Sequence, residues 1–393
     1  MRTITRRGAL KSILWAAAPC LAGRPVQRLA SLLAGDAPVS EAERAAMARV
    51  AQDFRQRFAV PGLSVAIARN GQTVYDQPFG EADRERGQPL RAASLFRIAS
   101  VTKPITSAAV FTLVEKGRLS LTDKVFGKDG ILGTEYGKSP YRRYVTDITL
   151  DHLLTHTCGG WENDSTDPMF RFREMNHAQL ISWTLDNLPL LNPPGEHYAY
   201  SNFGYCVLGR VIETISRQPY ADYVGRQVLE PCGITDMRIA GNTLKQRAPN
   251  EVVYFGQSGE DPYNMNVARM DSHGGWLATA ADLARFAGRV TVNAAGLGIL
   301  KRETIAKMVS PGPVSNPSAA VKYARGWSVR EEGRGNWWHN GSLPGTTPIM
   351  VRTASGFSWA ALCNTRRQPG DEINLALDNM VWDMARRVSA WRV

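Results

Sequence analysis

Strand-like segments lie at both ends of the chain, and helical segments lie between them. Residues 61–83 contain two β-rich runs joined by Asn70-Gly71, the pair most typical of a tight β-hairpin turn. After residue 325, four short runs rich in β-branched and aromatic residues are separated by turn residues, which predicts an antiparallel meander. Because sequence-distant strands can share one sheet, this order predicts a single sheet built from both chain ends.

Amphipathic helices are predicted at both ends of the chain as well, over residues 41–58 and 372–391. The expected fold class is α/β (α+β): an antiparallel β-sheet flanked by terminal helices, with a large, mainly helical inserted subdomain. We expect a single domain over residues 35–393. Its sheet region should cover about 40–100 and 325–393, and its helical region about 103–290. Helices within that region are predicted near 103–116, 177–187, 203–217, 220–230 and 281–292.

The composition is that of an ordinary globular protein, with 44% hydrophobic and 21% charged residues among 393. The formal net charge is +11, but residues 1–34 hold six basic residues and no acidic one, which leaves +5 for the remainder. The later basic residues are dispersed along the chain rather than gathered in a stripe. We therefore expect no nucleic-acid partner.

The first 23 residues, MRTITRRGALKSILWAAAPCLAG, combine a basic start, a mildly apolar stretch and small residues. This order resembles a twin-arginine export signal, with the arginine pair at Arg6 and Arg7. The alternative is a basic, disordered tail on a cytosolic protein. The uncharged stretch from Ser12 to Gly23 is shorter than the about 20 residues that cross a bilayer. We expect an export signal within residues 1–34, a periplasmic or secreted protein without a stable membrane span, and an undefined cleavage site.

Cysteines outside the leader show no metal-binding pattern. They form no C-x-x-C pair and have no metal-like spacing with the six histidines. We therefore expect no metal site, and we expect Cys158 to be a packed residue rather than a reactive thiol. The sequence does not decide whether disulfides form among these four cysteines, which are Cys158, Cys206, Cys232 and Cys363.

A serine and a lysine three positions apart open the segment FRIASVTKPITS, residues 96–107. If a helix starts at Ser100, the hydroxyl of Ser100 and the amine of Lys103 lie on one helical face and can touch. A serine at the positive end of a helix also sits where an oxyanion is stabilised. The alternative is that Ser100 only caps the helix and Lys103 is a solvated side chain.

Two later motifs contain further polar groups. Tyr200-Ser201-Asn202 precedes an apolar helical run, and His339-Asn340-Gly341 ends a predicted strand. A nucleophilic serine needs a group that shuttles protons and donors for the oxyanion, which these motifs can supply. The alternative is a tyrosine in an ordinary loop, with Asn202 capping the next helix.

Taken in order, the three motifs resemble those of the serine β-lactamase and penicillin-binding superfamily, in its branch of class C β-lactamases, D-aminopeptidases and esterases. They are S-x-x-K at 100–103, Y-x-N at 200–202 and [KH]-x-G at 339–341. Similar flanking stretches lie at 115–125, 150–160 and 274–286, and the resemblance extends over roughly residues 40–385.

The resemblance implies that Ser100 attacks a carbonyl while Lys103 assists the loss of its proton. Tyr200 would relay protons, and the nearby ammonium would have to favour its phenolate. Asn202 would orient Lys103 and the substrate. The backbone N–H groups of Ser100 and Ser342 would form the oxyanion hole, and water would release the acyl group. No metal or organic cofactor enters this scheme.

The third motif departs from the Lys-Thr-Gly typical of β-lactamases and D,D-peptidases. Histidine, with a reference pKa of about 6.5, is mostly neutral at pH 7, so the fixed positive charge for an anionic substrate is lost unless an arginine elsewhere compensates. This favours esters or neutral amides. His273-Gly274-Gly275 also fits H-x-G, but His339 is preferred because it follows a strand-like run. The neighbouring Trp161, Trp276, Trp337 and Trp338 are interpreted mainly as core or sheet aromatics.

The leading hypothesis is a serine hydrolase that acts through an acyl-enzyme on a small-molecule ester, amide or peptide. The alternatives are a penicillin-binding D,D-peptidase or D-aminopeptidase, and a sensor module that is acylated but does not turn over. A non-catalytic structural protein is a third class. The sequence leaves the substrate and the oligomeric state undefined.

Overall fold

The computed structural model describes residues 39–391 except 258, 291–297, 316–320, 331–333, 368–369 and 390. The predicted leader, residues 1–34, lies outside the described residues. Residues Pro38–Trp391 form one compact unit.

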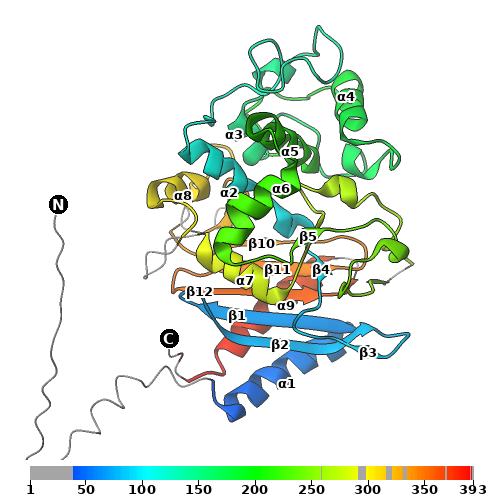
Figure 1. Ribbon diagram of the computed structural model, residues 1–393, viewed down its shortest axis with the longest axis vertical. Coiled ribbons are helices and arrows are strands. Elements are labelled where there is room, and N and C mark those ends of the chain that lie inside the picture. Colours follow the sequence, from blue (N-terminus) through cyan, green and yellow to red (C-terminus); the bar gives the residue numbers. More distant parts are fainter. Residues whose placement is uncertain are drawn as a thin grey trace, which may run out of the picture. The chain divides into compact units, whose positions relative to one another are not determined.

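An eight-stranded antiparallel sheet is the centre of this unit (Figure 1), with the strand order β3-β2-β1-β12-β11-β10-β9-β8. N-terminal strand β1 lies directly beside C-terminal strand β12, in a register that runs from Leu63↔Cys363 to Arg69↔Phe357. The prediction of one sheet made from both chain ends is therefore confirmed. The strands are β1 (Gly62–Arg69), β2 (Gln72–Asp83), β3 (Gln88–Pro89), β8 (Lys322–Tyr323), β9 (Ser328–Val329), β10 (Trp337–Asn340), β11 (Thr347–Arg352) and β12 (Phe357–Cys363).

Strand β1 is buried on both faces because layers of helices cover both sides of the sheet. Val65 and Ile67 pack in the apolar cluster of the terminal helices, whereas Ala66 and Ala68 belong to the larger cluster of the helical region. This alternation is the period of two expected for a strand. Small residues on the second face allow helix α7 (Ala280–Arg289) to lie against the sheet.

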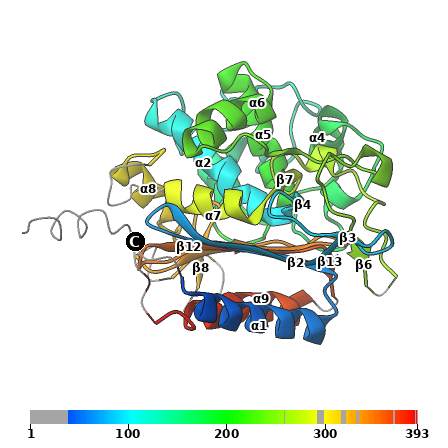
Figure 2. The same cartoon turned by 60° about the horizontal axis from the view of Figure 1, so that its bottom comes forward.

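Helices α1 (Glu41–Phe58) and α9 (Gly370–Ala385) pack together on one face of the sheet, and the other helices lie across the opposite face (Figure 2). Helix α1 has the predicted bounds. The predicted last helix ends six residues early, because the chain after Ala385 turns back: Trp391 Nε1 donates to the Ala385 carbonyl at 2.9 Å, and Ser389 N donates to Glu43 Oε1 at 2.9 Å.

Helices of the middle region follow the predictions closely, with three exceptions. The helix predicted over 220–230 is α-helical only over Tyr220–Val224 and continues as a π-helical turn, Gly225–Leu229. Helices α3 and α8 were not predicted. The helices are α2 (Thr102–Glu115), α3 (Leu150–Leu154), α4 (His177–Asn187), α5 (Asn202–Ser216), α6 (Tyr220–Val224) and α8 (Arg302–Val309).

Short strands outside the main sheet tie the helical region to it. Strand β4 (Phe96–Arg97) pairs with β7 (Trp276–Ala278), which also pairs with β5 (Arg238–Ile239). Strand β6 (Phe255–Gly256) runs parallel to β13 (Thr365–Arg366). Since β4 ends three residues before Ser100, its pairing fixes the approach to that serine.

The four cysteines of the described chain are free and buried. Burial raises the pKa of the Cys158 thiol to about 11, which suits a packed side chain and not a nucleophile. Among the described helices, none combines the length and the apolar character needed to cross a membrane.

Candidate active site

Ser100 and Lys103 are brought into contact at the start of helix α2. A 3₁₀ turn, Ala99–Val101, leads directly into the α-helix, and Lys103 Nζ lies 3.1 Å from Ser100 Oγ. Ser100 is partly exposed, whereas Lys103 is fully buried. No side chain caps either helical segment, so the interpretation of Ser100 as a helix cap is wrong.

The Lys103 amine has three hydrogen-bond acceptors, which matches the three protons of an ammonium. They are Ser100 Oγ, Asn202 Oδ1 at 2.7 Å and the His273 carbonyl oxygen at 3.2 Å. Burial disfavours the charged form and lowers the pKa of Lys103 to about 7, while the charge of Asp167 opposes this shift. Lys103 is therefore poised to exchange a proton near neutral pH.

Asn202, the first residue of α5, connects Lys103 to a buried acid. Its Nδ2 donates to Asp167 Oδ2 at 2.8 Å and to Asn163 Oδ1 at 2.9 Å, which directs Oδ1 toward the lysine. Burial raises the pKa of Asp167 to about 6. The helix is capped by Ser201, whose Oγ accepts from Gly204 N at 3.0 Å, so the interpretation of Asn202 as a cap is wrong.

Tyr200 lies directly before α5 and faces the same serine, whose side chain acts to lower the pKa of the phenol. Lys103 Nζ lies 4.7 Å from the centre of its ring. Burial raises the pKa of Tyr200 above its usual range. The expectation that the ammonium would favour a phenolate is not supported, because loss of solvation has the largest effect on this pKa and Lys103 is not among the groups that shift it. The phenol keeps its proton at neutral pH.

His156 packs beneath Tyr200 and was not predicted as part of the site. The two ring centres are 4.2 Å apart. His156 Nδ1 accepts from Ser201 N at 3.1 Å, and burial holds its pKa well below the usual range, so the imidazole is neutral. Its contacts fix the chain on both sides of Tyr200. The sequence signal was THTCGG, residues 155–160, but nothing in that stretch indicates a contact with residue 200.

His339 is buried on β10, and both of its ring nitrogens are hydrogen-bonded. Nδ1 lies 2.6 Å from the Asn340 carbonyl oxygen, which can only accept, so Nδ1 carries the proton. Nε2 therefore accepts from the hydroxyl of Tyr323 at 3.0 Å. Burial lowers the pKa of His339 to about 3. The third motif thus contributes a neutral imidazole.

The third motif also lies against the residues that lead into Ser100. A Cβ on Gly341 would come within 2.8 Å of the Ile98 carbonyl oxygen and 3.0 Å of Ala99 Cβ, so only glycine fits there. Ser342 follows with an exposed side chain, and Asn340 is exposed as well. Within the described chain, the backbone N–H groups of Ser100 and Ser342 donate no hydrogen bond.

The alternative H-x-G sequence borders the same cluster through its backbone. His273 is buried, and its carbonyl oxygen accepts a hydrogen bond from Lys103. Gly274 lies beside Ala99, because a Cβ on Gly274 would be 3.7 Å from the Ala99 carbonyl carbon. The structure therefore brings together Ser100, Lys103, Tyr200 and Asn202 directly and places the residues around His339 and His273 at the border.

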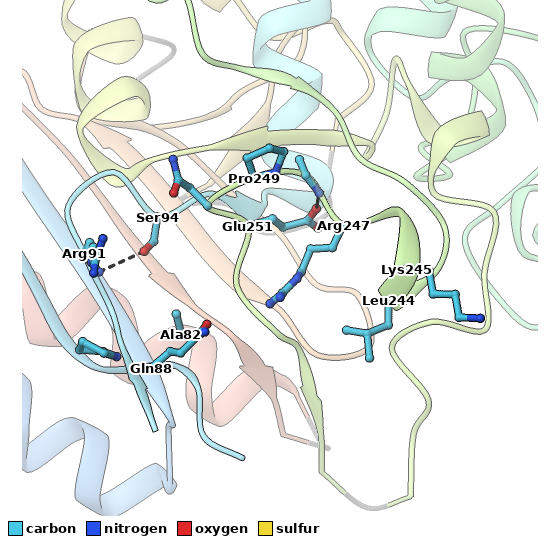
Figure 3. A pocket seen from close by; sticks show the side chains of 12 residues that line it. Ala82, Gln88, Arg91, Ser94, Leu244, Lys245, Arg247, Pro249 and Glu251 are labelled. Carbon is cyan, nitrogen blue, oxygen red and sulfur yellow. Dashed lines mark hydrogen bonds between the residues drawn. The ribbon is translucent and has the colours of Figure 1, made fainter. Parts of the chain in front are cut away.

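A cavity of about 590 Å³ lies between the β2–β3 region and the segment 244–251 (Figure 3). Among the described residues that line it, the one acid is Glu251, whose Oε1 accepts from Tyr254 at 2.9 Å and lies 3.7 Å from Arg97 Nε. Among the residues that line the cavity, none belongs to the Ser100 cluster, so it is a separate feature. In the part of the chain that the structure describes, no group of three or more His, Cys, Asp or Glu is placed to hold a metal ion.

Comparisons with known proteins give one family. The Beta-lactamase family model matches residues 47–379. Esterase EstB of Burkholderia gladioli is 34% identical over 200 residues, 47% of this chain and 48% of that protein. Penicillin-binding protein 4* of Bacillus subtilis (strain 168) is 26% identical over 317 residues, 74% of this chain and 64% of that protein. The chain thus spans less than two thirds of the length of either relative.

Solved structures show the same fold. D-amino acid amidase from Ochrobactrum anthropi SV3, complexed with L-phenylalanine amide, superposes with a TM-score of 0.72 at 20% identity, covering 88% of this chain and 99% of that one.

Proposed function

Because the chain belongs to the Beta-lactamase family, we propose that it is a serine hydrolase that cleaves esters or amides through an acyl-enzyme on Ser100. One observation carries the proposal: the amine of Lys103, 3.1 Å from Ser100 Oγ, is buried and has its pKa lowered to about 7. A lysine in water keeps its proton at this pH, whereas this one is available as a base.

Proton transfers follow from the three polar groups. Lys103 takes the hydroxyl proton as Ser100 Oγ bonds to the substrate carbonyl carbon. The bond to the leaving oxygen or nitrogen then breaks, and Tyr200 donates its phenolic proton to the departing atom. The resulting phenolate takes the proton from Lys103, which restores both groups. In the second half, Lys103 takes a proton from water, the water oxygen bonds to the acyl carbon, and the acid leaves as Ser100 regains its proton.

The substrate carbonyl oxygen becomes negatively charged during both steps, and hydrogen-bond donors must stabilise this charge. The backbone N–H groups of Ser100 and Ser342 are proposed for this role because neither has an acceptor within the described chain. Each preorganised donor contributes on the order of 3 kcal/mol to transition-state stabilisation. Asn202 is proposed as the positioning residue for Lys103.

Esters or neutral amides are the proposed substrates. His339 is neutral and buried, so the third motif supplies no cation for an anionic substrate. Similarity to an esterase supports the ester. A second candidate, a penicillin-binding protein that is acylated and released slowly, is supported by the similarity to penicillin-binding protein 4*.

One assay separates these candidates from one another and from a non-catalytic protein. Purified protein is mixed with p-nitrophenyl butyrate, and release of p-nitrophenol is followed from milliseconds to minutes. A hydrolase gives continued turnover, an acylable sensor stops after one equivalent, and a structural protein gives no burst. Ser100→Ala should abolish release, and Ser310→Ala, which changes an exposed serine elsewhere, should not. Equal activity in the Ser100→Ala enzyme would refute the proposal.

Export is proposed on sequence grounds alone, with residues 1–34 as a twin-arginine signal ahead of a single hydrolase domain over residues 35–393. Replacing Arg6 and Arg7 by lysine should leave the full-length protein in the cytoplasmic fraction of a bacterial host. An unchanged distribution between cytoplasm and periplasm would contradict the signal.

A further inference from the structure

Arg366 is a cation beside the third motif. Strand β13 presents Arg366 so that its Nη1 lies 3.5 Å from Ser342 Oγ. Ser342 follows Gly341, where a Cβ would come within 3.0 Å of Ile98 and Ala99, the residues that lead into Ser100. The guanidinium therefore contacts the side chain of the residue whose backbone N–H is proposed to face the reacting carbonyl.

His339 does not supply a second cation at this edge. Its two nitrogens are engaged by the Asn340 carbonyl and the Tyr323 hydroxyl, and the ring is 3% exposed. Arg366 is the cation that the structure shows in contact with Ser342.

Glu260 binds Arg366 with both carboxylate oxygens. Arg366 Nε donates to Oε2 at 3.2 Å, and Nη2 donates to Oε1. Both side chains are mostly buried, 15% exposed for Arg366 and 19% for Glu260. A two-point pair of this kind fixes the orientation of both groups and cancels their net charge.

The backbone holds Glu260 in this position. Gly256 on β6 pairs with Arg366 on β13, and a Cβ on Gly256 would come within 1.9 Å of the Glu260 carbonyl oxygen. Glycine at 256 therefore lets the backbone of residue 260 touch the strand that lies next to Arg366. Both partners of the ion pair are positioned by the same two strands.

We infer that the Glu260–Arg366 pair is a specificity determinant that selects uncharged substrates and disfavours those with a carboxylate on the acyl chain, an inference that rests on the proposed hydrolase function. An anionic group entering beside Ser342 meets the Glu260 carboxylate together with Arg366, so it must displace that carboxylate or lie next to a like charge. An uncharged ester or amide meets a neutral pair and is not opposed.

The test compares two esters with the same leaving group. kcat/KM is measured for p-nitrophenyl pentanoate, which is neutral, and for p-nitrophenyl hemisuccinate, which has a terminal carboxylate; the release of p-nitrophenol without enzyme, fast for the hemisuccinate because its carboxylate attacks its own ester, is subtracted. Glu260→Gln keeps the shape of the side chain and removes its charge. The ratio of kcat/KM for the hemisuccinate to kcat/KM for the pentanoate should therefore rise at least about tenfold. Arg366→Gln leaves Glu260 without this partner, and the ratio should fall.

Glu372→Gln is the matched control, because it removes one negative charge from an exposed pair with Arg57 on the terminal helices. An unchanged ratio in Glu260→Gln, or an equal rise in the control, would overturn the inference while leaving the hydrolase proposal intact. If the Gln variant does not fold, the Arg366→Gln ratio decides alone: equal losses on both esters would indicate only a structural role. Absence of turnover of either ester by the wild type would overturn both proposals.

Discussion

Lys103 Nζ and Asn202 Oδ1 lie 2.7 Å apart, although 99 positions separate the two residues in the chain. The amide cannot rotate freely, because its Nδ2 is bound to Asp167 and Asn163. Asn202 therefore presents an uncharged acceptor to a buried amine. A neutral acceptor orients Lys103 without the strong preference for the ammonium that a carboxylate would impose.

Replacing that acceptor by a carboxylate should inactivate the enzyme at neutral pH. In Asn202→Asp the new negative charge stabilises the ammonium, so the pKa of Lys103 rises and less free amine is present at pH 7. We expect kcat/KM at pH 7 to fall at least about tenfold and to recover partly at higher pH. A pH–rate profile with p-nitrophenyl butyrate measures this. Asn187→Asp, a change on α4, is the control, and a profile of Asn202→Asp that matches wild type would contradict the role of Asn202.

Activity of the wild type should rise as pH increases through about 7. The pKa of Lys103 is lowered to about 7, and the proposed base is the deprotonated amine. The acid limb of kcat/KM should therefore have an apparent pKa near 7, and Lys103→Arg, whose guanidinium keeps its proton, should lose at least about 10³-fold. An acid limb near pH 4 would assign the base to a carboxylate instead.

Stability should depend on the same proton. Lys103 is half protonated at about pH 7 in the folded protein, but its reference value is 10.5, so between these values the unfolded chain binds one proton more. Burial of this amine therefore costs stability; the cost is largest and constant below pH 7 and is relieved as pH rises, by about 1.4 kcal/mol per pH unit between pH 8 and 10. Urea unfolding of wild type and Lys103→Met is measured at several pH values. The difference between their unfolding free energies cancels the contributions of the other titrating groups. A constant difference across this range would contradict the lowered pKa.

The local sequence predicts some features of the fold and of the site and does not predict others. The contact between Ser100 and Lys103 depends only on positions three apart at a helix start, so their spacing predicts it. The sheet was predictable because hairpin and meander signals are local, and only the pairing of β1 with β12 is long-range. The four tryptophans interpreted as core or sheet aromatics are all buried or partly buried in the apolar clusters: Trp161, Trp276, Trp337 and Trp338.

Residues that support the site came from loops whose paths leave no periodic signal. Asp167 contacts Asn202 from a loop with no motif, and His156 contacts Tyr200 across 44 positions. Glu260 reaches Arg366 only because two-residue strands β6 and β13 run in parallel. Two residues are too few for the alternation of apolar and polar positions to be recognised in the sequence. The lowered pKa of His339 results from burial of its ring, and the motif alone does not indicate that burial.

Tyr200→Phe should slow the chemical step more than substrate binding. Because Tyr200 stays protonated at rest, it acts as the proposed donor to the leaving group, and its loss should lower kcat about 10²-fold or more with little change in KM. Tyr198→Phe is the matched control, since Tyr198 lies two residues away and also packs on His156. Comparable losses in both variants would indicate that the aromatic cluster, and not the hydroxyl of Tyr200, is required.

The neutral state of His339 gives a test of what the third motif contributes. His339→Gln retains hydrogen-bonding groups without a titratable ring, so kcat/KM for a neutral ester should stay within about tenfold of wild type. His339→Lys would place an ammonium in a buried position that has no acidic hydrogen-bond partner in the described chain, which should destabilise the protein by about 3 kcal/mol or more. Thermal unfolding and ester kinetics measured on both variants check the two statements. A large loss of activity in the folded Gln variant would contradict the first statement and would indicate that the imidazole takes part in the reaction.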